Sequence, residues 1–191
     1  NNQVDDSALI ESLDRLSKNN FGNIVIIKST IPPGTSKTYL SKFNLNFVFN
    51  PEFLRESTTP NEDFENQDTV VIGTNDKAVF NKVKAFYKKI LNSDTSYYFL
   101  PYESAEMIKY SQNMTLASRV AISNIVYDAC NQFNIDYSSI KEIAFDSFEV
   151  LGPHMTEVPG PDGLRGFGGK CLPKDILGFN SVYHSKILDS I

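Results

Sequence analysis

The sequence predicts an α/β fold with a parallel sheet over its first half, followed by an all-helical domain built on one long helix. Two observations carry this prediction. Over the first hundred or so residues, short apolar runs bounded by turn residues alternate with helical patterns, the order expected of strands connected by helices. From Glu103 to Phe133 the apolar residues instead recur at helical spacing, with no glycine or proline between them.

The first predicted domain comprises residues 1–98. Its predicted strands are the apolar runs at residues 24–27, 46–49, 69–72 and 96–100. A continuous apolar run such as the first is typical of a strand buried on both faces of a parallel sheet. Its predicted helices lie over 7–18, with Asp6 or Ser7 as the N-cap, over a short stretch after the turn at 32–35, and from about 76 to 89.

The second predicted domain comprises residues 99–191 and contains no strand. The long helix forms its spine, and the helices predicted in it lie over residues 103–133, 138–145 and 175–184. Residues 152–169 hold most of the chain's glycines and several prolines. We therefore expect an irregular, mobile loop in that segment.

The bulk composition excludes several classes of protein. The 191 residues carry a formal net charge of -5, whereas a non-specific nucleic-acid binder needs a basic face. No apolar run approaches the roughly 20 residues of a bilayer-spanning helix. The two cysteines, Cys130 and Cys171, show neither a metal-binding spacing nor a disulfide framework. We therefore expect a cytoplasmic protein without a metal.

The segment at residues 165–175, Arg-Gly-Phe-Gly-Gly-Lys-Cys-Leu-Pro-Lys-Asp, surrounds Cys171 with glycines and basic residues. The glycines let the backbone approach a ligand, Pro173 favours a helix that starts just after the cysteine, and the basic residues suit a phosphate-bearing ligand. A thiol at a helix N-terminus beside Lys170 and Lys174 should have a lowered pKa, as a nucleophile needs. The alternative is a buried structural cysteine beside a solvated basic turn, and the pattern alone leaves both open.

Two further pairs of polar residues are each four positions apart. Lys109 and Asn113 project from one face of the long helix, where a lysine could stabilise an oxyanion and an amide could orient a hydroxyl. Glu52 and Glu56 follow the carboxyl end of a predicted strand, where ligands collect in open α/β sheets, so one could act as a general base. The alternatives are a solvated polar stripe and a capping or surface pair.

The segment Ser29-Thr-Ile-Pro-Pro-Gly-Thr35 also follows the end of a predicted strand. Its amides and hydroxyls could line a cofactor cleft, although a simple turn fits the spacing equally well. Cys130 lies on an apolar helix face and is expected in the core.

Taken together, these segments resemble the UDP-glucose/GDP-mannose dehydrogenase family. The matching stretches are Ser-Thr-Ile-Pro-Pro-Gly-Thr, Asn-Pro-Glu-Phe-Leu-Arg-Glu, Lys-Tyr-Ser-Gln-Asn and Gly-Phe-Gly-Gly-Lys-Cys-Leu-Pro-Lys-Asp, at residues 29–35, 50–56, 109–113 and 166–175. They occur in the family's order over nearly the whole chain. The resemblance implies that residues 1–98 are the second half of a Rossmann-like NAD-binding domain and that residues 99–191 form the family's central, dimerising domain.

The resemblance also implies a reaction and roles for individual residues. The family oxidises the C6 alcohol of a nucleotide sugar to a carboxylate with two NAD+, through a thioester on a cysteine. Carried over, the nucleophile is Cys171 and the group that stabilises the oxyanion is Lys109. The residues that position water and hydroxyls are Asn113 and Asp175, the general base for thioester hydrolysis is Glu52, and Thr30 holds the water.

Binding residues follow from the same resemblance. The cofactor contacts that it implies are Ser29, Thr30, Glu56 and Lys174. The substrate contacts are Glu52, Phe53, Leu54, Arg55, Glu56, Lys109, Asn113, Phe167, Gly168 and Gly169. It further implies a homodimer formed through the long helix, and a nucleotide-sugar substrate. The family members that oxidise UDP-glucose are the nearest match, because of the stretch at residues 158–163.

Three departures from the family pattern accompany the resemblance. The Gly-x-Gly-x-x-Gly fingerprint for the NAD pyrophosphate and a C-terminal nucleotide-binding domain are both absent from the 191 residues, so we expect this piece to be inactive alone. Val150 stands where many members have an arginine.

The alternative substrates are GDP-mannose and a UDP-N-acetyl-hexosamine. The alternative of another class is a non-catalytic, dimerising remnant that binds a sugar nucleotide.

Overall fold

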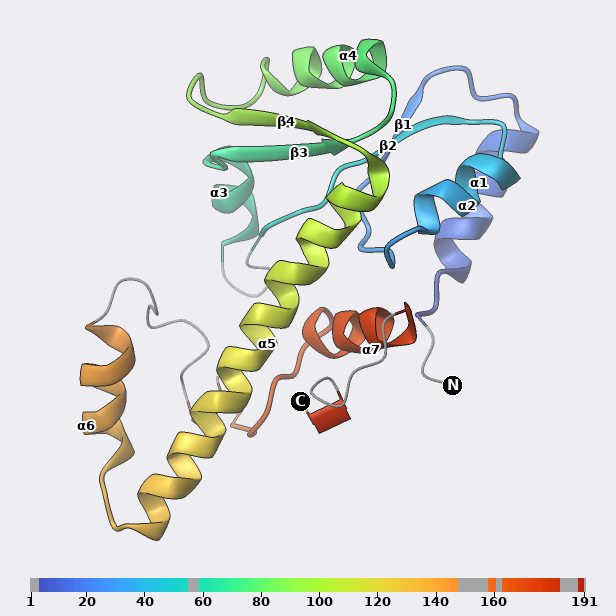
Figure 1. The fold of residues 1–191 in the computed structure, drawn as a ribbon. Helices are drawn as coiled ribbons and strands as arrows, with labels where there is room; N and C mark the ends of the chain where they lie inside the picture. Colours follow the sequence, from blue (N-terminus) through green and yellow to red (C-terminus); the bar gives the residue numbers. More distant parts are fainter. Residues whose placement is uncertain (1–3, 55–58, 148–157, 161–162, 183–188, 191) are drawn as a thin grey trace. The chain divides into compact units, whose positions relative to one another are not determined.

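The computed structural model describes residues 4–54, 59–147, 158–160, 163–182 and 189–190 (Figure 1). The chain forms two compact units, residues 1–110 and 111–191. The first unit contains the strands β1 (Ile24–Ile27), β2 (Asn46–Phe49), β3 (Thr69–Gly73) and β4 (Ser96–Leu100). Its helices are α1 (Ser7–Lys18), α2 (Thr35–Lys42), α3 (Pro60–Glu65) and α4 (Lys77–Tyr87).

Helix α5 (Tyr102–Gln132) begins in the first unit and ends in the second. The second unit also contains α6 (Tyr137–Lys141), the π-helical turn η1 (Glu142–Asp146) and α7 (Leu172–Val182). Within the described ranges, none of the helices combines the length and the apolarity that a membrane crossing requires.

The four strands form one sheet in the order β1-β2-β3-β4. β1 is parallel to β2 and β3 is parallel to β4, but β2 meets β3 antiparallel through the single pair Phe49 and Gly73. The prediction of a wholly parallel sheet is therefore wrong at this junction. After the connection that contains the six-residue helix α3, β3 runs back toward the end of β2.

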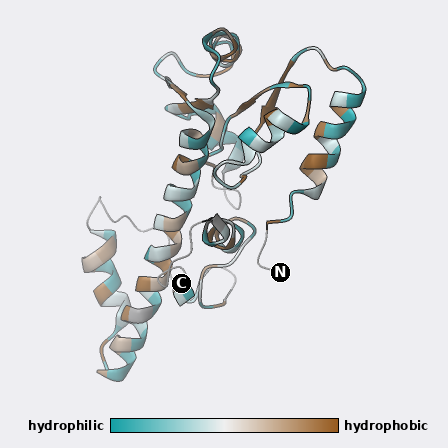
Figure 2. Cartoon of the chain, turned by 45° about the vertical axis from the view of Figure 1, so that its right-hand side comes forward, coloured by the Kyte–Doolittle hydropathy of each residue, from teal (hydrophilic) through white to brown (hydrophobic). Residues whose placement is uncertain are grey.

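The central strands β2 and β3 are largely buried on both faces, as expected of continuous apolar runs in a parallel sheet. β1, for which this was predicted, is half-buried except at Ile27, and β4 is largely exposed. Successive residues of β2 and β3 point to opposite faces, so Phe47, Phe49 and Val71 enter one core and Val48, Val70 and Ile72 the other. Helices α1 and α2 and the start of α5 contribute to the first core, and α4 contributes to the second. Figure 2 shows hydrophobic residues concentrated on the strands, whereas the helices alternate between hydrophobic and hydrophilic residues.

Most predicted elements are confirmed. The helix over 7–18 and the strands over 24–27, 46–49 and 96–100 have the predicted limits, and the long helix begins and ends one residue earlier. Asp6 is the N-cap residue of α1, as predicted, but its carboxylate makes no capping bond and instead accepts a 2.5 Å hydrogen bond from Tyr39. Helix α3 was not predicted, since six residues are too few to show apolar periodicity.

The second unit departs more from the predictions. The helix expected over 138–145 divides into α6 and the π-helical η1, and α7 begins at Leu172 rather than at 175. The irregular, mobile loop expected over 152–169 falls largely outside the described residues. Its described part, residues 158–160 and 163–169, contains no helix or strand.

Gly73, at the end of β3, is expected to tolerate no side chain. A Cβ placed there would lie 2.7 Å from the Ala105 Cβ and 3.2 Å from the Phe49 carbonyl oxygen. Gly73→Ala should therefore lower the free energy of unfolding by about 1–3 kcal/mol, measured by urea titration. Gly22→Ala is the matched control, because nothing lies within 4 Å of its Cβ position. Equal stability of the two variants would show that the β3–α5 contact is loosely packed.

Candidate active site

A first group of predicted site residues lies at the carboxyl ends of β1 and β2. The two strands are parallel, with Ile27 opposite Phe49, so the residues that follow them emerge at one edge of the sheet. The backbone N–H of Asn50 donates a hydrogen bond to the Ile27 carbonyl at 2.8 Å. This bond extends the pairing beyond the strands and brings Lys28 beside Asn50. This is the edge at which ligands bind in open α/β sheets.

Glu52, the predicted general base, forms an ion pair with Lys28. The Lys28 Nζ lies 3.3 Å from the Glu52 Oε1. The side chain of Lys28 is 30% exposed and that of Glu52 is 40% exposed, so the carboxylate keeps access to solvent while it is held from one side. The predicted partners Arg55 and Glu56 lie outside the described residues.

A buried amide supports this ion pair. The Asn50 Oδ1 accepts hydrogen bonds from the Lys28 Nζ at 3.1 Å and from the Tyr87 hydroxyl at 2.5 Å, and its Nδ2 donates to the Val71 carbonyl at 2.7 Å. Burial lowers the pKa of Lys28, and the charge of Glu52 acts in the opposite direction. Burial, and then the negative charge of Glu52, raises the pKa of Tyr87 to about 12.

Lys109, the predicted oxyanion-binding residue, lies on the part of α5 that belongs to the first unit. Its Nζ is 5.6 Å from the centre of the Phe53 ring, so the structure brings together two residues assigned to the substrate. Phe53 and Leu54 are both half-buried. Of the two predicted cofactor contacts after β1, Ser29 is exposed and Thr30 is half-buried.

A buried carboxylate fixes the segment that carries Ser29 and Thr30. Glu106 of α5 is 0% exposed, and its two carboxylate oxygens accept hydrogen bonds from the amides of Gly34 and Ser36 at 2.6 and 2.8 Å. These amides lie at the start of α2, where a negative charge is favourable. Burial raises the pKa of Glu106, while the hydrogen bonds from Ser36 and Gly34 act to lower it.

A second group of predicted site residues lies in the second unit, around the start of α7. Cys171 immediately precedes the helix, and its carbonyl accepts a 2.9 Å hydrogen bond from the Asp175 amide. The Cys171 side chain is half-buried, whereas Cys130 is 5% exposed and lies in the core, as predicted. The placement of Cys171 at a helix N-terminus is confirmed.

Asp175 anchors this second group of residues. The side chain is 0% exposed, and its carboxylate accepts a short hydrogen bond from the Asn113 amide and forms a 2.8 Å ion pair with Lys174. Asn113 is 4% exposed, so it does not belong to a solvated polar stripe. The structure thus brings together Asn113, Lys174 and Asp175, three residues predicted for the site.

The glycine-rich segment before Cys171 is largely exposed. Gly168 and Gly169 are exposed and Phe167 is half-buried. Gly169 has a φ of 76°, a conformation that favours glycine. The basic cluster expected to face a phosphate is partly engaged within the protein, because the Arg165 guanidinium pairs with Asp128 at 2.8 Å.

Sequence reasoning missed the residues that position this machinery, namely Lys28, Asn50, Tyr87 and Glu106. A signal was available for two of them. Lys28 is a charged residue directly after a wholly apolar strand, and Glu106 occupies an inward-facing position of an otherwise apolar turn, between Ala105 and Ile108. A charge at such a place requires a partner.

The described residues could contribute part of an NAD site. The hydroxyls of Ser29 and Thr30 follow β1 at the ligand-binding edge of the sheet, and the network around Asn50 keeps that edge in place. The 191 residues contain no Gly-x-Gly-x-x-Gly sequence, the usual holder of the pyrophosphate. Among the residues that the structure describes, no group of His, Cys, Asp and Glu side chains is arranged to hold a metal ion.

The burial of the two cysteines predicts different reactivities in the folded protein. Cys171 is half-buried at a helix N-terminus, whereas Cys130 is enclosed in the core. With a limiting amount of iodoacetamide, Cys171 should be alkylated about tenfold or more faster than Cys130, because access and thiolate character both favour it. Peptide mass spectrometry measures the two rates. Equal rates in the native protein, or faster labelling of Cys130, would contradict the prediction.

Glu106→Gln should lower the free energy of unfolding by about 1–3 kcal/mol. The neutral side chain keeps one oxygen and presents an NH2 group to the second amide, which leaves a buried donor without an acceptor. Glu103→Gln is the matched control on the same helix, since Glu103 is exposed, and it should change stability by no more than about 0.5 kcal/mol. Urea titrations compare the two. A Glu106 variant as stable as the control would mean that water replaces the lost contact.

The chain is similar to curated proteins that are more than twice its length. It is 33% identical over 195 residues to the UDP-glucose 6-dehydrogenase of Rickettsia bellii, covering 98% of this chain and 43% of that protein. It is 35% identical over 175 residues to the UDP-glucose 6-dehydrogenase of Campylobacter jejuni, covering 89% of this chain and 42% of that protein. The chain therefore spans less than half the length of these relatives.

Solved structures and family models agree with this similarity. A UDP-glucose dehydrogenase from Pyrobaculum islandicum superposes with a TM-score of 0.77 at 27% identity, over 95% of this chain and 42% of that one. A GDP-mannose dehydrogenase from Pseudomonas aeruginosa superposes with a TM-score of 0.65 at 26% identity, over 95% and 43%. Residues 2–91 match the NAD binding domain of the UDP-glucose/GDP-mannose dehydrogenase family, and residues 103–190 match its central domain. The chain belongs to the UDP-glucose/GDP-mannose dehydrogenase family, with a Rossmann-like NAD-binding portion followed by the helical central domain.

Proposed function

We propose that this chain carries the catalytic centre of an enzyme that oxidises the C6 alcohol of a nucleotide sugar to a carboxylate through a thioester on Cys171. The observation that carries the proposal is the start of α7. There the half-buried thiol precedes the helix, and the fully buried carboxylate of Asp175 is fixed one turn later by Asn113. A helix N-terminus favours the thiolate, which is the nucleophilic form.

Cys171 lets one site carry out two oxidations. Overall, one alcohol, one water and two NAD+ give one carboxylate, two NADH and three protons, with bound NAD+ accepting each hydride. After the alcohol has become an aldehyde, the Cys171 thiolate adds to the carbonyl carbon, and the oxygen takes a proton to form a thiohemiacetal. Loss of a second hydride and of the hydroxyl proton then leaves a thioester on the sulfur.

Lys109 and Asn113, carried over from the family, would stabilise charge in these steps. The Lys109 ammonium and the Asn113 amide would donate hydrogen bonds to the oxygen on C6, which becomes negative when the thiolate adds. Asp175 keeps the Asn113 amide in one orientation, because both groups are buried and hydrogen-bonded. An oriented donor needs no rearrangement when the charge develops, which is the source of its catalytic effect.

Hydrolysis of the thioester falls to Glu52 and Thr30. The Glu52 carboxylate takes a proton from water as the water oxygen attacks the thioester carbon. The tetrahedral intermediate then collapses, the C–S bond breaks, and the Cys171 thiolate and the carboxylic acid are released. The Thr30 hydroxyl would hold the attacking water, and the partial exposure of Glu52 allows that water to enter.

We propose UDP-glucose as the substrate, since two of the named relatives carry that activity in their names at 33% and 35% identity. The carried-over contacts in the first unit include Phe53 and Leu54, with Arg55 and Glu56. Those in the second unit are Asn113, Phe167, Gly168 and Gly169. GDP-mannose and a UDP-N-acetyl-hexosamine are the competing substrates. The enzyme would act in the cytoplasm as a homodimer formed through α5.

We further propose that the 191 residues do not turn over alone. The hydroxyls of Ser29 and Thr30, with Lys174 and Glu56, can contact only part of NAD+. The Gly-x-Gly-x-x-Gly sequence that usually binds its pyrophosphate is not among these residues. The assay therefore uses the whole gene product that contains this chain.

NAD+ reduction by that gene product is measured with UDP-glucose, GDP-mannose and UDP-N-acetyl-hexosamine as separate substrates. With UDP-glucose we expect about two NADH for each sugar oxidised, as the nucleophile-assisted double oxidation requires. Cys171→Ser should lower kcat about a thousandfold or more, since a nucleophile is lost. The matched control is Cys130→Ala, which removes the core thiol and should leave kcat unchanged.

Two outcomes would overturn the proposal. If no sugar nucleotide reduces NAD+, the non-catalytic remnant becomes the better explanation, and sugar-nucleotide binding by calorimetry would test it. If Cys171→Ser turns over at the wild-type rate, the thioester chemistry is wrong. Turnover with GDP-mannose or a UDP-N-acetyl-hexosamine in place of UDP-glucose would change the substrate and keep the mechanism.

A further inference from the structure

The Lys28 side chain has an unusual environment for a lysine. Its ammonium group lies 3.1 Å from the Asn50 Oδ1 and 3.3 Å from the Glu52 Oε1. The rings of Phe64 and Tyr87 are centred 6.0 and 5.9 Å from the Nζ. Four groups from three different segments, the stretch after β2, helix α3 and helix α4, therefore surround one charge.

Removing this ammonium from water is costly, which indicates that it has a specific task. Surface lysines usually keep their charge in water, and an isolated ion pair there contributes little to stability. Lys28 is only 30% exposed, and burial lowers its pKa. The compensating groups are the Glu52 carboxylate, the Asn50 oxygen and two aromatic faces.

We propose that Lys28 is a positioning residue for hydrolysis of the thioester, holding the Glu52 carboxylate in the orientation in which it accepts the proton of the attacking water. The inference rests on the proposed function, because it assigns a partner to the general base of that reaction. Lys28 itself touches neither the water nor the sugar in this proposal. It acts only through Glu52.

The surroundings of Lys28 are rigid enough for this task. Asn50 is 2% exposed and follows β2, and its Nδ2 is held by the Val71 carbonyl of β3. The Tyr87 hydroxyl donates to the same Asn50 oxygen that accepts from Lys28. The Asn50 side chain therefore cannot turn without breaking several buried hydrogen bonds, and Lys28 has a fixed anchor.

The position of the proton acceptor matters most in one step. In hydrolysis, water gives a proton to Glu52 while its oxygen bonds to the thioester carbon, and the C–S bond then breaks to release the Cys171 thiolate. A general base must lie within hydrogen-bonding distance of the water it activates. The hydride transfers and the addition of the thiolate place no such demand on Glu52. Loss of Lys28 should therefore slow hydrolysis alone.

The test is Lys28→Met in the whole gene product, with UDP-glucose and NAD+, followed by rapid mixing. Wild-type enzyme should show steady NADH formation. The variant should show a burst of about two NADH per subunit, followed by turnover slowed roughly tenfold to a hundredfold, less than the effect of losing a general base. Because only deacylation slows, kcat and KM should fall together and kcat/KM should hold. Acid quenching should trap the sugar on Cys171, visible as added mass.

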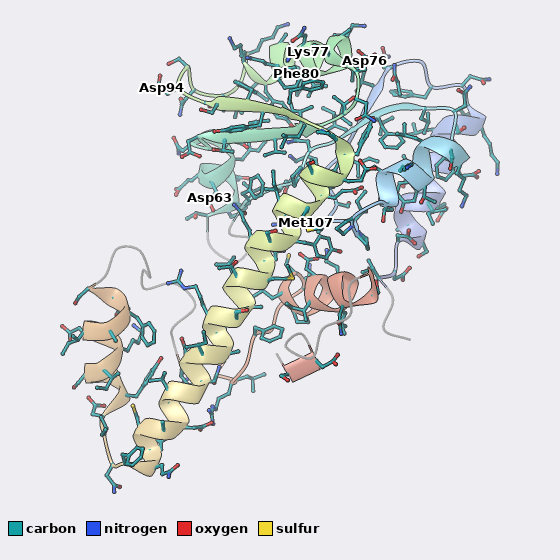
Figure 3. The ribbon with its side chains drawn as sticks, in the orientation of Figure 1. Asp63, Asp76, Lys77, Phe80, Asp94 and Met107 are labelled. Atoms are coloured by element: carbon teal, nitrogen blue, oxygen red, sulfur yellow. The ribbon has the colours of Figure 1, made fainter. Side chains whose placement is uncertain are left out.

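Lys77→Met is the matched control. Lys77, on α4, also packs against two rings, with its Nζ 4.3 Å from the centre of Phe80 and 4.4 Å from that of Phe99. Figure 3 shows Lys77 and Phe80 on this helix. The control should show neither a burst nor trapped sugar. If Lys28→Met fails to fold, Lys28→Gln keeps a hydrogen-bond donor for Asn50 while removing the charge, and it should show the same burst.

The outcomes separate this inference from the function on which it rests. A wild-type enzyme that reduces no NAD+ with any sugar nucleotide overturns the proposed function, and the role of Lys28 with it. An active wild type with a Lys28 variant that lacks the burst, or whose kcat/KM falls as far as kcat, overturns only the role of Lys28. Such a variant would have lost stability or binding, measured by thermal melting and by KM.

Discussion

Two fully buried carboxylates, those of Glu106 and Asp175, constrain this structure. A carboxylate removed from water must find donors, or the folded state loses several kcal/mol. Glu106 finds them in the backbone amides of Gly34 and Ser36, and Asp175 finds one in the side chain of Asn113. Glu106 and Asn113 both belong to α5, so one helix supplies the polar contact that fixes the loop in the first unit and the start of α7 in the second.

The fold was largely predictable because its elements bury apolar residues at regular intervals. The strands are short continuous apolar runs, and α5 runs from Tyr102 to Gln132 without a helix breaker. What the sequence did not reveal depends on contacts between distant residues. The antiparallel meeting of Phe49 with Gly73 and the short helix α3 follow from how the chain packs after β2, which no local pattern encodes.

The candidate site also contains residues that a local pattern predicts and residues that only contacts between distant parts of the chain identify. Cys171, Lys109 and Glu52 could be selected because their residue types and spacings suit a reaction, and a helix begins just after Cys171, as Pro173 indicated. The residues that hold these side chains in place, such as Lys28 and Asn50, were not predicted. Asn50 is an ordinary polar residue in the sequence, and only the register of β1 with β2 shows that its amide meets Lys28.

The junction between β2 and β3 has a mechanical consequence. One residue pair joins two separately paired strand ribbons there, and the Asn50 side chain supplies a further link by donating to the Val71 carbonyl. The Asn50 side chain thus supplies a hydrogen bond to β3 beyond the single residue pair between β2 and β3. The Asn50 side-chain oxygen also accepts a hydrogen bond from Lys28. One residue therefore both links the two ribbons and holds the lysine that pairs with Glu52. Shear between the two ribbons would therefore also displace Lys28 and the Glu52 carboxylate with which it pairs.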